Sequence, residues 1–120
     1  MTQPATPIIH NAPPTLRLDI LMHQDSKGIW VAHCLQLDLV HSGKDAEQVY
    51  SEARQVCAEH VRFAMEHDNI DHLFVPPNPE LYGKMLKAQS LGTLCLVIER
   101  TQRHQTQVLE FQRLLAKKAA

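Results

Sequence analysis

Cysteine is scarce in this 120-residue sequence, and long apolar runs are absent. The three cysteines, Cys34, Cys57 and Cys95, are too few and too scattered for a disulfide framework or a paired zinc site. The apolar runs fall far short of the roughly 20 residues that cross a bilayer. Residues 1–14 have neither the basic cluster nor the apolar segment of a secretory signal. We therefore expect a reduced, cytoplasmic protein without a membrane partner.

Net charge is also small, since 12 Lys and Arg stand against 13 Asp and Glu, giving −1, while 44% of the residues are apolar. This composition excludes an intrinsically disordered chain and fits one globular domain. The balance hides an asymmetry. From Lys84 onward seven basic residues face two acidic ones, a net +5, whereas residues 1–83 carry −6. The split predicts two surfaces that prefer partners of opposite charge, or two solvated surfaces.

The first half of the chain has the pattern of strands followed by a long helix. Residues 1–14 hold four prolines and no periodicity, which predicts a flexible leader. Apolar residues alternate with polar ones over 16–23, and a second β-rich run covers 29–35, with a tight turn at 25–28 between them. A third short strand is expected over 37–41. The apolar residues of 45–67 recur every three or four positions, which predicts a helix with Asp45 as its N-cap.

The second half predicts a short helix from Pro79 to about Gln89 and a strand over Thr93–Ile98. That strand is apolar at nearly every position, so we expect cover on both of its faces. Val108, Phe111, Leu114 and Leu115 suggest an apolar stripe on a closing helix over 102–117. The predicted fold is therefore a two-layer α+β domain with an antiparallel β-β-β-α-β core and an extra C-terminal helix.

One stretch of this core matches a known pattern. An aromatic-Val-Ala strand leads to a Leu-Asp segment, and a glycine turn and a helix follow. The strand residues are Trp30, Val31 and Ala32, and the next segment has Leu37 and Asp38. The turn has Gly43, Lys44 and Asp45, and the helix has Ala46, Glu47 and Ala53. In this order and spacing, IWVAHCLQLDLVHSGKDAEQVYSEARQVCAEHV resembles the core of the HicB-type antitoxin family. The later segment NIDHLFVPPNPELY is similar to a passage in stand-alone members. The resemblance covers residues 16–82, and Lys44-Asp45 replaces the family's usual Asp-Thr.

The resemblance implies a partial ribonuclease-H-like fold that performs no chemistry. In the family this fold covers a small basic ribonuclease toxin of the HicA type. Together with the patterns above, the resemblance divides the chain into a leader (1–14), a HicB-like α+β core (15–100) and a C-terminal amphipathic basic helix (101–120). Full-length family members often add a DNA-reading domain, but only about twenty residues follow Ile98, too few for a three-helix reader. Direct DNA binding is therefore doubtful.

Catalytic and metal sites are not expected. Two-metal nuclease chemistry needs several converging carboxylates, and only Asp19 and Asp38 could lie on adjacent strands, since Asp25 belongs to a turn and Asp45 to a cap. Among eight histidines none has a strong ligand spacing, and Cys57 is expected in the core. We predict no enzyme activity, no metal and no cofactor.

The remaining candidates are binding residues. Trp30, Asp38 and Asp19 are candidates for toxin binding, although a large strand residue such as Trp30 is also typical of packing. The stripe Val108, Phe111, Leu114 and Leu115 can hold a homo-oligomer or cover the sheet. Arg100, Arg103, Arg113, Lys117 and Lys118 are candidates for nucleic-acid contact or a solvated face. Besides antitoxin-like binding, a stand-alone oligomeric domain with a regulatory or RNA-binding role stays open.

Overall fold

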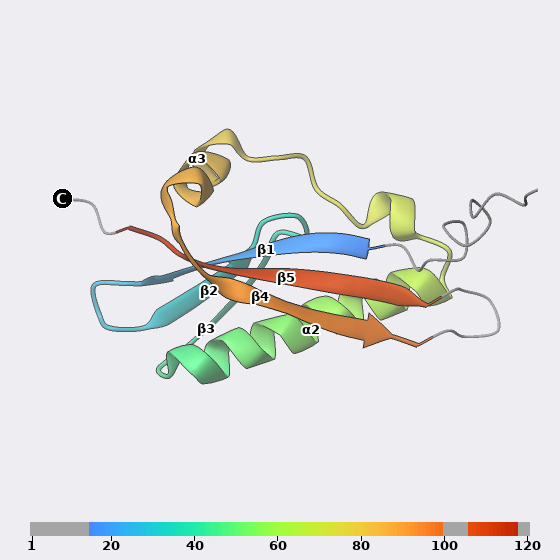
Figure 1. Cartoon of the computed structure of the whole chain (residues 1–120), viewed down its shortest axis with the longest axis horizontal. Coiled ribbons are helices and arrows are strands. Elements are labelled where there is room, and N and C mark those ends of the chain that lie inside the picture. The colour runs from blue at the N-terminus through green and yellow to red at the C-terminus, as the bar shows by residue number, and fades with distance from the viewer. Residues whose placement is uncertain (1–14, 100–105, 118–120) are drawn as a thin grey trace, which may run out of the picture.

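Five strands form one mixed sheet with a long helix on one face (Figure 1). The computed structural model describes residues 15–99 and 106–117. The sheet order is β3-β2-β1-β5-β4, and only the β1–β5 pair is parallel. The elements are β1 (Thr15–Gln24), β2 (Trp30–Cys34), β3 (Leu39–Gly43), α2 (Ala46–Glu66), the 3-10 turn η1 (Ile70–His72), α3 (Pro79–Lys87), β4 (Gln89–Ile98) and β5 (Gln107–Leu115). The expected α+β class is confirmed, but the sheet is mixed rather than antiparallel.

The β1–β2 hairpin is confirmed at its predicted turn. Asp25 Oδ1 accepts hydrogen bonds from the backbone N–H groups of Lys27 at 2.8 Å and Ile29 at 2.9 Å. Gly28 completes the turn with φ +82°, a conformation that costs glycine little. The turn therefore fixes the register in which Gln24 pairs with Trp30.

Helix α2 begins at the predicted cap. The Asp45 side chain accepts from the backbone N–H of Gln48 at 3.0 Å, which satisfies one of the free donors of the first turn. Its buried face packs on the sheet, and the residues on it are Val49, Tyr50, Ala53, Cys57, Ala58, Val61, Ala64 and Met65. Two residues beyond the helix, Asp68 adopts a left-handed backbone conformation with φ +52°. The sequence thus predicted this helix with its boundaries.

The prediction of a C-terminal helix is wrong, because Gln107–Leu115 forms strand β5 between β1 and β4. Of the residues predicted to form that helix, 101–105 and 118–120 lie outside the described part of the chain. The cause is that β5 is covered on both faces: Phe111 faces α2 and is fully buried, while Leu114 packs with Leu21 and Leu35. Apolar residues on both sides of a central strand remove the two-residue alternation, and the remaining spacing imitates a helix. Phe111 and Leu114 are therefore core residues, while Val108 and Leu115 are half-buried.

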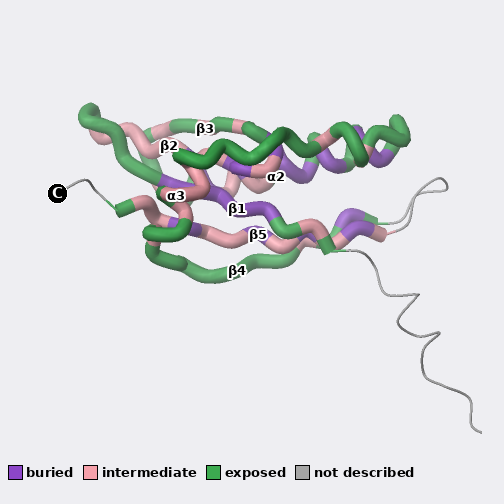
Figure 2. Tube along the Cα trace, turned by 90° about the horizontal axis from the view of Figure 1, so that it is seen from above, coloured by how far each residue is buried: buried purple, intermediate pink, exposed green. Residues whose placement is uncertain are grey.

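The two sheet faces are covered unequally. The main core lies between α2 and the sheet, where Leu18, Ile20 and Phe111 are fully buried. On the opposite face α3 covers only one end of the sheet (Figures 1 and 2). Strand β4 is exposed along most of its length, with Ile98 its one buried residue, which corrects the expectation of cover on both faces. Among the described residues no helix is long and apolar enough to span a membrane.

Candidate functional site

The solvent-facing side of the C-terminal half of α2 carries an exposed aromatic ring between acidic side chains. Phe63 is 62% exposed, although it lies on the longest helix and not in a loop. Glu59 and Glu66 stand one turn before and one turn after it, so their side chains share its face. We call Glu59, Phe63, Glu66 and His67 the Phe63 surface.

The Phe63 ring is held in place by the end of its own helix. His67 stacks on it with ring centroids 4.0 Å apart and an angle of 23° between the planes. The Nδ1 atom of His67 also donates to the carbonyl oxygen of Phe63 at 2.9 Å. A ring fixed in this way loses little side-chain entropy when a partner covers it, which favours binding.

The electrostatics of the Phe63 surface favour a cationic partner. Glu59 and Glu66 are exposed, and neither makes an ion pair with another described residue. Arg62 is the basic neighbour on this side of the helix, and Asp71 adds a further exposed acid just beyond it. An aromatic anchor with a polar rim is typical of a protein-binding surface, and the rim here is acidic.

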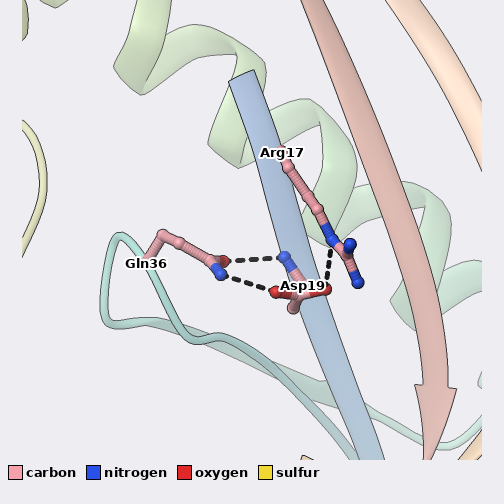
Figure 3. Close-up of polar contacts among 3 residues, drawn as sticks. All are labelled: Arg17, Asp19 and Gln36. Atoms are coloured by element: carbon pink, nitrogen blue, oxygen red, sulfur yellow. Dashed lines mark hydrogen bonds and ion pairs between the residues drawn. The ribbon is translucent and has the colours of Figure 1, made fainter. Parts of the chain in front are cut away.

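Asp19, a candidate partner residue, is instead buried in the middle of β1 at 4% exposure (Figure 3). The side chain of Gln36 clamps it from the turn before β3: its Oε1 accepts from the Asp19 N–H at 2.7 Å, and its Nε2 donates to Asp19 Oδ2 at 2.7 Å. Arg17 Nε adds a contact to Oδ1 at 3.3 Å. The carboxylate is therefore used within the fold and is not presented to a partner.

The other two candidate partner residues differ from Asp19 in their surroundings. Asp38 is exposed in the turn between β2 and β3 with φ +52°, and its Oδ1 lies 2.8 Å from His33 Nε2. Trp30 is half-buried and packs against the main core next to α2. The structure thus does not bring Trp30, Asp38 and Asp19 into one exposed surface.

Arg113, expected as a nucleic-acid contact, ties β5 to α2. Its guanidinium makes two hydrogen bonds to the Glu47 carboxylate, at 2.9 and 2.8 Å, and lies 4.5 Å from the centre of the Tyr50 ring. This guanidinium lowers the pKa of the Glu47 carboxyl, while burial raises the pKa of Tyr50. Arg54 lies over the same ring at 4.7 Å.

The other basic candidates give little further support for a phosphate-binding surface. Lys117 is exposed at the end of β5. Arg100, Arg103 and Lys118 lie outside the described residues.

The described ranges hold no group of three or more His, Cys, Asp or Glu side chains arranged to bind a metal ion. Cys34 and Cys57 are buried in the main core and hydrogen-bond to each other, which raises the pKa of the Cys57 thiol. Core placement of Cys57 is as predicted. Cys95 is exposed on β4.

A cavity of about 890 Å³ opens between the β1–β2 hairpin, α3 and the end of β5. Its wall combines apolar side chains with hydrogen-bond donors, and the main ones are Leu21, His23, Trp30, His33, Lys84 and Lys117. His33 already contacts Asp38, and the two lysines are exposed at the rim. The wall also includes Asp25, so its charges are of both signs, and none of its charged or histidine side chains is buried.

Sequence patterns missed the Phe63 surface because aromatic residues in amphipathic helices are usually assigned to the core. The signal was present: Phe63 falls outside the three-and-four spacing of the buried residues Cys57, Val61 and Ala64. Comparison of the sequence and structure with known proteins identifies no relative. No family model matches the sequence, and no curated protein or solved structure is similar to it at a significant level.

Proposed function

We propose that this protein is a non-enzymatic antitoxin-like module that neutralises a small basic ribonuclease by covering it. The observation that carries the proposal is the Phe63 surface, an immobilised exposed ring with glutamates one helical turn away on either side. A basic partner gains from both features, because the acids steer its approach and the ring supplies a desolvated anchor.

The fold supports the same proposal. Three antiparallel strands lead into one long helix in the order that the resemblance to the HicB-type family implies. The acidic side chains of the described residues do not converge on one point. Asp45 caps α2, Asp19 is bound by Gln36, and others are spread over the surface. This arrangement suits a protein that binds its target without reacting with it.

The experiment begins at the gene. We expect a short reading frame for a small basic protein beside it, and the product of that frame is purified and assayed on a labelled RNA. Adding the present chain at equal concentration should abolish RNA cleavage, and the two proteins should elute together. The absence of such a frame, or undiminished cleavage with the chain in excess, would contradict the proposal.

Matched variants locate the surface. Phe63→Ala should weaken the complex by more than about tenfold, because truncating a hot-spot residue costs about 2 kcal/mol or more. Phe74→Ala serves as the control, since Phe74 is also exposed, at 39%, but lies outside the Phe63 surface. Equal losses for both variants would place the interface elsewhere.

A further inference from the structure

The two edges of the sheet are unequal in their protection. β3 forms one edge with five residues, includes His41 and Ser42, and is followed directly by Lys44. β4 forms the other edge with ten residues, QSLGTLCLVI, which contain no charge and no proline. Short length, charge and proline are the usual means by which an edge strand avoids pairing with another chain. β4 has none of these three, and its one irregularity, between Ser90 and Thr93, leaves the run 93–98 regular.

The free edge of β4 also exposes apolar side chains on both faces of the sheet. Val97 is 56% exposed, Leu91 42% and Leu94 38%. Within the described ranges β5 is the only strand paired with β4, so the backbone N–H and C=O groups on its outer edge have no strand partner. An edge of this kind is a template for a further strand.

We propose that β4 pairs antiparallel with β4 of a second copy of this chain, so that two sheets join into one. The absence of charge in β4 favours a second copy of the same strand as its partner. An uncharged strand meets its own copy without placing like charges opposite each other, and an antiparallel pair of identical edges closes into a two-fold dimer.

The register of the pair follows from the irregularity in β4. Pairing with β5 shifts between Ser90 and Thr93, where Gly92 has φ +113°, so the regular part of the strand is 93–98. Side chains that face each other across a strand pair must lie on the same face, so the two-fold axis passes through a residue. Within 93–98 an axis at Cys95 and an axis at Leu96 give equally many facing pairs. An axis at Leu96 would use Ile98, which is already buried in its own subunit, so we place the axis at Cys95.

This register continues the core of each subunit across the interface. Leu94 and Leu96 lie on the α2 face, because they pair with Phe111 and Leu109 of β5. With Cys95 at the axis, Leu94 of each copy faces Leu96 of the other, which gives a cluster of four leucines. Leu96 already packs against the main core, so the cluster extends an existing apolar layer.

Light scattering on the full chain tests the dimer. At about 100 μM, where an interface with a micromolar Kd is largely occupied, the wild type should have the mass of a dimer. Leu94→Lys and Leu94→Glu should each be monomeric, and a one-to-one mixture of the two should regain the dimer, since a folding defect could not be repaired by mixing. Val40→Lys is the matched control: Val40 is 62% exposed on the opposite edge, and its dimer should persist.

Cys95 tests the register. Facing cysteines at the axis have Cβ atoms about 5 Å apart, so a short bis-maleimide should join two wild-type chains and leave Cys95→Ser unjoined. Cys34 and Cys57 are buried and should not react. A monomeric wild type, a dimer that survives both Leu94 changes, or a dimer without cross-linking would each overturn the proposal.

Discussion

At Asp19 the side chain of Gln36 supplies the hydrogen-bond acceptor that a neighbouring strand would otherwise provide. Pairing of β1 with β2 begins at Ile20, so the backbone of Asp19 lies just beyond the end of β2. The Gln36 side chain takes over the N–H of Asp19, and the C=O of Asp19 accepts from Leu35 N–H at 3.0 Å. Gln36 C=O in turn accepts from Val75 N–H at 3.0 Å. Gln36 thus holds β1 through its side chain and the segment before α3 through its backbone carbonyl.

Asp19→Ala should lower the free energy of unfolding by about 1–3 kcal/mol, because it leaves the partly buried Gln36 amide without its acceptor. Gln36→Ala should cost a similar amount, and the double variant should cost less than the sum of the two. Urea denaturation gives these values. Arg17→Ala is the control, with a cost below about 1 kcal/mol, since Arg17 is 61% exposed. An Asp19→Ala protein as stable as the wild type would show that the clamp does not stabilise the fold.

The ion pair between Glu47 and Arg113 makes stability depend on pH. The pKa of Glu47 is lower in the folded state than its ordinary value of 4.5, because Arg113 hydrogen-bonds to the ionised form. Its contribution is therefore present at neutral pH and is lost as the pH falls through the folded-state pKa. Thermal melts should show Glu47→Gln below the wild type at pH 7, with the two curves converging in acid. Glu59→Gln, which removes an exposed acid that has no ion-pair partner among the described residues, should not reproduce this convergence.

At the scale of elements, the N-cap of α2 is the clearest link between sequence and structure. Asp45→Ala removes the acceptor for Gln48 N–H and should cost about 0.5–2 kcal/mol, measured from denaturant midpoints. Asp45→Asn keeps an acceptor and should recover most of the loss. If Asp45→Ala leaves the midpoint unchanged, the cap is not contributing to stability.

Elements whose own sequence carries a local signal, such as a turn or cap residue, were predicted well. The β1–β2 turn, α2 and α3 each have a local signal, such as Asp25 and Gly28 in the turn or Pro79 at the start of α3. β5 has no such signal, since its identity depends on β1 and β4 lying beside it and on helices above and below. The choice between helix and strand for residues 107–115 was made by tertiary packing, which no local pattern contains.

At the scale of the whole molecule, the sequence predicted the fold class but not the location of the candidate site. Asp19 and Arg113 have residue types typical of binding sites, yet each is engaged inside the fold. Phe63 has a residue type typical of cores, yet it faces solvent. Exposure decides these roles, and it depends on which distant residues the fold brings together, such as Gln36 beside Asp19 and Glu47 beside Arg113.

The position of β5 also sets the order in which the domain can form during synthesis. Thr15 pairs with Val108, so the strand beside β1 is translated long after β1, β2, β3 and α2 have left the ribosome. Until then β1 has a bare edge, and the main core lacks Leu109 and Phe111, which are both fully buried in the finished protein. Long-range pairing of this kind is slow and leaves apolar surface open to other chains in the meantime. We therefore expect a chain that ends before β5 not to fold into a stable smaller domain, because it lacks the strand beside β1 and two fully buried core residues.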